Sequence, residues 1–89
     1  MHAVVVKVSI EDLGPAEEYL KEEIVPQVSQ LPGFVGGYWT RSDDGGNGMS
    51  MMVFESEDAA KGVASRLPQE GNEAVTIENV EVREVVASA

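Results

Sequence analysis

Aromatic rings and thioethers gather in two short stretches of the chain, on either side of a glycine-rich segment. They are Phe34, Tyr38 and Trp39 in the first stretch and Met49, Met51, Met52 and Phe54 in the second. A cleft with apolar walls and a few polar groups suits a planar aromatic molecule, and Tyr and Trp each bring one polar group. The two stretches therefore indicate either ordinary core packing or a binding cleft for a small aromatic compound.

The numbering of these residues within their expected strands predicts which of them share a face. Four have even numbers: Phe34, Tyr38, Met52 and Phe54. Since side chains alternate between the faces of a strand, we expect these four to point toward the helices, with Gly36 leaving room for a helix or a ligand. A change of register by one residue would exchange Tyr38 and Trp39, so the sequence places one of the two in the cleft without deciding which.

Other groups that carry chemistry are scarce. The only histidine is His2, for which we expect a frayed position near the terminus, and the chain has no cysteine. Without a second histidine or a thiolate we expect no metal site. No Ser-His-Asp arrangement and no nucleotide-binding motif can be assembled from the remaining residues.

Charge and hydropathy exclude further classes of function. The chain has 16 acidic and 6 basic residues, and the resulting net charge of −10 opposes binding to the phosphates of nucleic acid. No apolar run approaches the roughly 20 residues of a membrane-spanning helix, and the start of the chain lacks the features of a secretory signal. We therefore expect a cytoplasmic protein that binds neither nucleic acid nor membrane.

The elements that must position the aromatic residues follow from apolar periodicity. In order, they are a strand at 3–8, a helix at 15–31, strands at 33–41 and 48–55, a helix at 56–67 ended by residues 68–72, and a strand at 74–89. Pro26 should kink or divide the first helix, and Pro32 and Gly33 should end it. Residues 42–48 suit a hairpin turn, and Ser56 is a natural N-cap. In the last strand the apolar positions change phase near Asn79, which indicates a bulge.

The order β-α-β-β-α-β predicts a single α+β domain over residues 1–89. This is the ferredoxin-like arrangement, a four-stranded antiparallel sheet with two helices on one face. Both faces of the first strand look largely buried, although no remaining segment is available to cover the second face. A second copy of the sheet would cover it and enlarge a small core. Patterning alone therefore predicts a homodimer joined through the open face of the sheet.

Over nearly its whole length the chain resembles the antibiotic-biosynthesis-monooxygenase-like family of the dimeric α/β-barrel superfamily. The resemblance rests on the element order, on VPQVSQLPGF at the end of the first helix, and on VFESEDAAKGVASRL across the third strand and second helix. It implies a barrel formed by two facing sheets, with a pocket between sheet and helices in each subunit. Some members oxidise polycyclic phenols with molecular oxygen and no cofactor, some degrade haem, and others have no established role.

The chain departs from the pattern of this family at two positions. Many members end the third strand with Trp-Glu-Ser and carry a His in the second helix, whereas this chain has Phe54 and Val63 there. Because haem-degrading members use that His as a ligand, the resemblance implies that haem does not bind, and we expect no cofactor. Loss of the Trp removes one pocket wall that would carry a hydrogen-bond donor.

Cofactor-free oxidation requires a shaped, dry pocket and a group that assists deprotonation of the substrate. Tyr38 and Arg41 are the predicted catalytic residues, and Ser50 and Tyr19 are further candidates for that role. The predicted ligand-binding residues are Tyr19, Phe34, Tyr38, Trp39, Ser50, Met52, Phe54 and Val63. Two hypotheses stay open: a cofactor-independent monooxygenase acting on a small aromatic or polyketide-like molecule, and a non-catalytic dimeric module that binds a ligand or only assembles.

Overall fold

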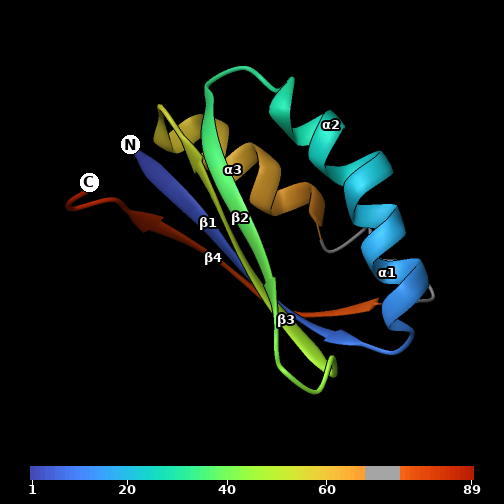
Figure 1. Cartoon of the computed structure of the whole chain (residues 1–89). Helices are drawn as coiled ribbons and strands as arrows, with labels where there is room; N and C mark the ends of the chain where they lie inside the picture. The colour runs from blue at the N-terminus through green and yellow to red at the C-terminus, as the bar shows by residue number, and fades with distance from the viewer. Residues whose placement is uncertain (68–74) are drawn as a thin grey trace.

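The computed structural model describes residues 1–67 and 75–89, in the predicted β-α-β-β-α-β order. Its elements are β1 (His2–Ile10), α1 (Leu13–Tyr19), the π-helical segment η1 (Leu20–Ile24), α2 (Val25–Ser29), β2 (Phe34–Arg41), β3 (Asn47–Phe54), α3 (Glu57–Arg66) and β4 (Val75–Glu84). The strands form one antiparallel sheet in the order β2-β3-β1-β4, and the described helices lie on one of its faces (Figure 1). The ferredoxin-like fold is thereby confirmed.

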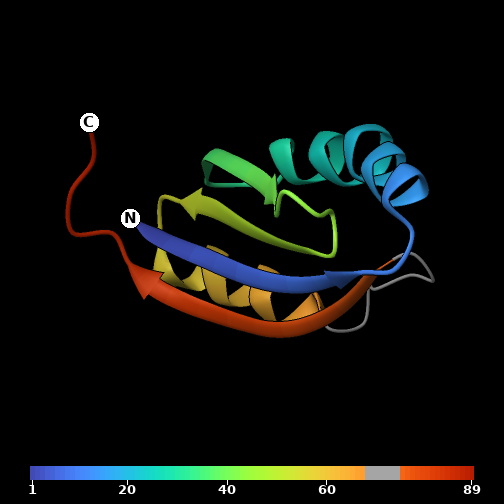
Figure 2. The same cartoon turned by 60° about the horizontal axis from the view of Figure 1, so that its bottom comes forward.

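The core lies between the sheet and the helices. Alternation along β1 turns Val4 and Val6 toward the helices, where both are buried. Among the described residues, the buried cluster consists of Val4, Val6, Val28, Met52, Phe54, Ala60, Val63 and Leu67. On the opposite face of β1, Ala3 is buried and Val5 is half-buried. α3 packs over β1 and β4, and α2 lies over β2 (Figure 2).

Pro26 divides the first helical run, as the sequence predicts. The chain leaves α-helical geometry in η1, and α2 begins one residue before Pro26. Proline has no N–H to return a hydrogen bond to the carbonyl of Glu22, but it is well tolerated in the first turn of a new helix. α2 ends at Ser29, two residues before the predicted end of the helix, and the turn that follows contains Gly33, whose φ of 81° lies in the left-handed region that favours glycine. None of the described helices has the length and apolar character that crossing a bilayer requires.

The predicted hairpin turn between β2 and β3 is confirmed, and Asp44 organises it. The Ser42 hydroxyl donates to Asp44 Oδ1 at 2.6 Å, and the Gly46 N–H donates to the same oxygen at 2.9 Å. These two hydrogen bonds hold the pKa of the Asp44 carboxyl below its ordinary value. Gly45 supplies the positive φ of the turn, 74°.

α3 begins at the predicted N-cap, because Ser56 Oγ accepts the N–H of Ala59 at 3.1 Å. Ala60 and Val63 form its buried stripe. The predicted end of this helix at 68–72 lies outside the described residues.

A bulge in β4 matches the predicted change of phase. Asn79 pairs with Lys7 and Ile77 pairs with Val8, so Glu78 is an extra residue on β4. The extra residue keeps the apolar positions before and after it on the helix side. The predicted strand at 74–89 is too long, however, because β4 ends at Glu84. The Val85 N–H still donates to the Met1 carbonyl at 3.0 Å, and the chain after it extends away from the sheet (Figures 1 and 2).

A second bulge, which was not predicted, lies at the start of β2. Phe34 pairs with Phe54, whereas Gly36 pairs with Val53, so the register shifts by one residue between Phe34 and Gly36. From there to the end of β2, odd-numbered residues face the helices and even-numbered residues face the open side of the sheet.

Candidate functional site

A cleft of about 250 Å³ lies between the helix side of the sheet and the α1–η1 run. Its floor includes Val6, Val8 and Met52, and its helical wall includes Ala16, Leu20 and Ile24. Among the described residues, the polar or charged side chains that line it include Glu17, Tyr19, Lys21, Arg41 and Ser50. Apolar walls with a few polar groups are typical of sites for small organic molecules, and the volume lies just below the usual range of about 300–1,000 Å³. We call this site the cleft.

The bulge in β2 decides which aromatic residue faces the cleft. After the bulge, Trp39 pairs with Ser50 and Tyr38 pairs with Met51. Trp39 therefore joins the wall of the cleft, whereas Tyr38 lies on the open face of the sheet with 80% of its surface exposed. The prediction that Tyr38 shares a face with Met52 is wrong, because the extra residue reverses the alternation.

The indole of Trp39 lies over Gly37. A Cβ atom at Gly37 would stand 3.1 Å from Cη2 and 3.2 Å from Cζ3 of the Trp39 ring, and 3.1 Å from the carbonyl oxygen of Met51. These separations are shorter than ordinary van der Waals contact, so the missing side chain is what lets the ring lie against its own strand. At Gly36, where we expected this role, an added Cβ would meet nothing within 4 Å.

The cleft brings together five of the predicted site residues: Tyr19, Trp39, Arg41, Ser50 and Met52. Three others belong to the core rather than to the lining of the cleft. The rings of Phe34 and Phe54 pack edge to face with their centroids 5.7 Å apart, and Val63 is buried among the core residues on α3. Tyr38 is the fourth predicted residue outside the cleft.

An ion pair joins the end of β2 to α1 at the edge of the cleft. Arg41 Nε donates to Glu17 Oε1 at 2.8 Å, and both side chains are partly exposed. Glu17 and Lys21 were not predicted as site residues, since charged residues on a helix surface carry no apolar periodicity. The one available signal was Pro26, which predicts an irregular helix in this part of the chain.

Four polar groups of the lining make no hydrogen bond to any described residue: Tyr19 Oη, Lys21 Nζ, Trp39 Nε1 and Ser50 Oγ. They are not sealed in the core, because His2 Nδ1 is the only buried side-chain nitrogen or oxygen without a partner in the described part of the chain. Unpaired polar groups at the edge of an apolar cavity can orient a ligand.

The donors of the cleft do not fit a haem iron held through histidine. Val63, where the resemblance in sequence would place that ligand, is aliphatic and buried. His2 is not frayed, because it begins β1 and its Nε2 lies 3.3 Å from Glu57 Oε2, outside the cleft. Among residues 1–67 and 75–89, no three His, Cys, Asp or Glu side chains are grouped so that they could hold a metal ion.

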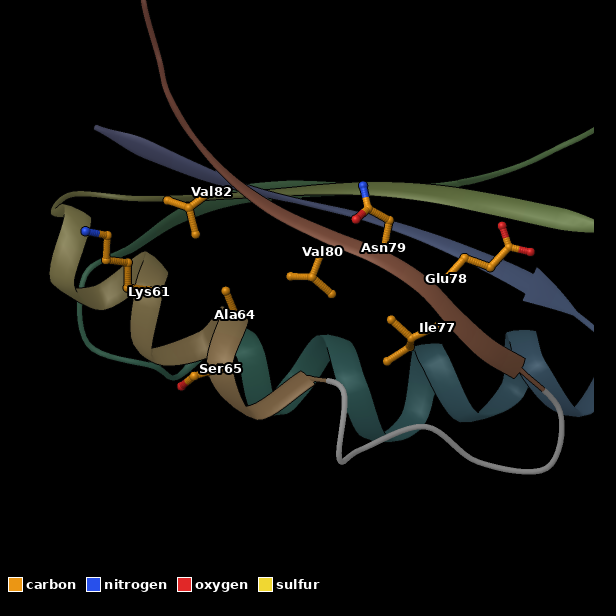
Figure 3. A pocket seen from close by; sticks show the side chains of 8 residues that line it. All are labelled: Lys61, Ala64, Ser65, Ile77, Glu78, Asn79, Val80 and Val82. Carbon is orange, nitrogen blue, oxygen red and sulfur yellow. The ribbon is translucent and has the colours of Figure 1, made fainter.

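A second depression, the α3–β4 groove, runs between α3 and the edge strand β4 (Figure 3). Its volume is about 520 Å³, and its apolar residues are Ala64, Ile77, Val80 and Val82. Each of its polar side chains already has a partner: Lys61 with Glu57, Ser65 with the carbonyl of Gly62, Glu78 with Ser9, and Asn79 with Glu81. The groove is larger, but the cleft is more enclosed by its two walls and keeps free polar groups, so the cleft is the candidate site.

No protein-family model matches the chain, and no curated protein matches it in sequence. Solved structures do resemble it. HapK from Hahella chejuensis has a TM-score of 0.73 at 14% identity, covering 100% of this chain and 96% of HapK. A mutant of MhuD with two manganese protoporphyrin IX molecules per active site has a TM-score of 0.70 at 20% identity, covering 100% and 98%.

MhuD from Mycobacterium tuberculosis with two hemes in its active site has a TM-score of 0.55 at 22% identity, covering 97% of this chain and 98% of that one. HapK and MhuD are antibiotic-biosynthesis-monooxygenase-like proteins, the group that the sequence resembles. At these identities the likeness concerns the backbone, and the chain shares the ferredoxin-like fold of HapK and MhuD from end to end.

Proposed function

We propose that the chain binds a small aromatic molecule in the cleft. The observation that carries this proposal is an apolar cavity walled by the Trp39 indole, with the hydroxyl groups of Tyr19 and Ser50 unpaired among the described residues. Aromatic rings pack favourably against an indole, and the two hydroxyl groups can fix the orientation of a guest. The shared fold supports the proposal, because MhuD binds two hemes in its active site.

Trp39 provides the test, since it is the only tryptophan of the chain and lines the cleft. Titration with a panel of anthrones and hydroquinones should change its fluorescence in a saturable way, after correction for absorption by the ligand. Tyr38→Phe is the matched control, because Tyr38 lies on the opposite face and its loss should leave binding unchanged. If no compound of the panel changes the fluorescence or gives a calorimetric binding heat, the proposal is contradicted.

A second candidate function is oxidation of the bound molecule without a cofactor. Loss of a proton from an anthrone leaves an enolate, whose negative oxygen the Arg41 guanidinium and the hydroxyl groups of Tyr19 and Ser50 can stabilise. With molecular oxygen the methylene group of the substrate becomes a carbonyl. One oxygen atom enters that carbonyl, the other leaves in water with the two methylene hydrogens, and the substrate supplies all the electrons.

Oxygen uptake with the same panel tests the second candidate. Uptake should exceed the protein-free background, should fall in Arg41→Ala, and should persist in Tyr38→Phe. Binding without uptake would instead support the alternative of a non-catalytic ligand-binding module. The cytoplasmic location stays a prediction under either function.

A homodimer is the third part of the proposal. On the open face of the sheet, large apolar side chains are well exposed: Tyr38 at 80%, Met49 at 52% and Met51 at 46%. Contiguous exposed apolar side chains mark interaction sites, and a second copy of the same face would cover them. Tyr38→Glu should shift the chain to a monomer in sedimentation equilibrium, whereas the control Gln27→Glu, exposed on α2, should not. A wild-type chain that is monomeric at micromolar concentration would exclude the dimer.

A further inference from the structure

The unpaired polar groups of the cleft are mainly hydrogen-bond donors. The Trp39 N–H and the Lys21 ammonium can only donate, and the hydroxyl groups of Tyr19 and Ser50 can donate as well as accept. Among the described residues of the lining, Glu17 is the one that carries a carboxylate, and it already accepts from Arg41. A ligand that satisfies these groups must therefore offer acceptors.

The charged side chains of the lining also favour a ligand that offers acceptors. Lys21 and Arg41 are two of the six basic residues of the chain, and Glu17 is the acidic residue beside them among the described residues of the lining. These described residues bring two positive charges and one negative charge to the cleft, in a chain with a net charge of −10. Within the described part of the chain Lys21 has no ion pair, so none of these residues competes with a ligand for its ammonium.

The described lining of the cleft combines apolar and cationic side chains. Trp39, Val6 and Met52 supply apolar surface for rings, and Lys21 and Arg41 supply positive charge. Arg41 Nε is engaged by Glu17, and its Nη1 makes a long contact of 3.5 Å with the Ser42 carbonyl, so N–H groups of its guanidinium remain for a further acceptor.

We propose that the cleft selects aromatic acids, in which the ring packs against Trp39 and a carboxylate accepts hydrogen bonds from Lys21 and Arg41. This inference rests on the proposed binding of an aromatic molecule and adds the charge of the ligand. Hydrogen bonds between charged groups are stronger than those between neutral groups, so the carboxylate distinguishes an acid from its neutral analogues.

Three probes of nearly the same shape test the inference by calorimetry on the full chain: naphthalene-2-carboxylate, naphthalene-2-carboxamide and naphthalen-2-ylmethylammonium. The carboxylate should bind about threefold to tenfold more tightly than the carboxamide, and the ammonium should bind most weakly. Lys21→Met should weaken only the carboxylate and remove most of its advantage. Lys61→Met is the matched control, because Lys61 pairs with Glu57 outside the cleft, and it should change none of the three.

Different results would contradict the selection for acids and the binding of an aromatic molecule. If the carboxamide binds as tightly as the carboxylate and Lys21→Met has no effect, the selection for acids is overturned while aromatic binding stands. If none of the three probes binds, both proposals are overturned. A carboxylate advantage that shrinks as salt rises supports the inference, since screening weakens an exposed charge pair.

Discussion

The cleft and the α3–β4 groove lie on the same side of one sheet, yet they differ in how their polar groups are used. In the groove Lys61, Ser65, Glu78 and Asn79 are all paired within the chain. In the cleft four polar groups have no partner in the described part of the chain. A satisfied polar group stabilises the fold, whereas an unsatisfied one at the edge of a cavity is available for binding. The larger volume therefore belongs to the depression whose polar groups are paired, and the unpaired polar groups belong to the smaller one.

The helices over the two depressions also differ in how regular they are. α3 beside the groove is a regular α-helix with a side-chain N-cap at Ser56. The run beside the cleft starts at Asp12 without a side-chain cap, passes through the π-helical segment η1 and contains Pro26. π-helical turns are rare and often occur at functional sites. Regular, capped structure therefore accompanies the groove, and irregular structure accompanies the cleft.

Replacing a glycine beside the cleft and a glycine beside the groove should give the largest difference in stability between the two regions. An added Cβ at Gly48, in the cleft lining, would stand 2.8 Å from the Thr40 carbonyl oxygen of the neighbouring strand, so Gly48→Ala should destabilise the fold by about 1–3 kcal/mol. At Gly62 on α3 an added Cβ would meet nothing within 4 Å, and Gly62→Ala should stabilise by about 0.5–1 kcal/mol. Urea unfolding measures both, and a neutral Gly48→Ala would contradict the tight packing of the cleft floor.

The sequence predicts the architecture well because each element has its own local signal. Alternating valines mark β1, Ser56 caps α3, and the phase change near Asn79 reveals the β4 bulge. The β2 bulge has no such signal, since Gly36 and Gly37 carry no side chain that could show a change of phase. That bulge alone decides which of Tyr38 and Trp39 faces the cleft.

The candidate site was predictable only in part for the same reason. Tyr19, Ser50 and Met52 were found because alternation and helical spacing bring them toward the cleft. Lys21 was missed because an exposed lysine on an acidic helix looks like a solvated residue. Its place in the lining depends on how α1 and η1 sit over the sheet, which is a tertiary property.

Placing a leucine in the lining of each depression should show which of the two depressions binds the ligand. Ser50→Leu adds bulk to the cleft lining and should weaken binding of an aromatic ligand at least about tenfold, or about 1.4 kcal/mol. Ser65→Leu makes the matched change in the groove and should leave the affinity within about twofold, about 0.4 kcal/mol. Calorimetric titration with naphthalene-2-carboxylate compares the two. Equal losses, or a loss confined to Ser65→Leu, would place the ligand outside the cleft.

The two N-caps give a smaller contrast. Ser56→Ala removes the hydrogen bond from the Ala59 N–H and should destabilise α3 by about 1 kcal/mol. Asp12 makes no capping hydrogen bond with its side chain, so Asp12→Ala should change stability by less than about 0.5 kcal/mol. Urea unfolding at neutral pH measures both variants against the wild type. Similar losses would mean that the start of α1 is held as firmly as that of α3.

The smallest expected effect concerns Glu57, which pairs with the groove residue Lys61 at 3.0 Å. The hydrogen bond and the charge of Lys61 hold the pKa of the Glu57 carboxyl below its ordinary value. The folded chain therefore binds fewer protons than the unfolded chain in the acidic range. The stabilisation is present above about pH 5 and is lost as the pH falls through the ordinary and then the lowered pKa.

An NMR titration of the Glu57 side-chain carbon tests this pair directly. Lys61→Met should move the midpoint upward toward the ordinary pKa of a glutamate, because it removes both the hydrogen bond and the positive charge. Lys21→Met takes away a lysine of the cleft instead and should leave the Glu57 midpoint where it is. If the two variants shift the midpoint alike, net charge controls the titration. If only Lys61→Met shifts the midpoint, the ion pair between Lys61 and Glu57 controls the titration. Lys21 has no such ion pair with any described residue.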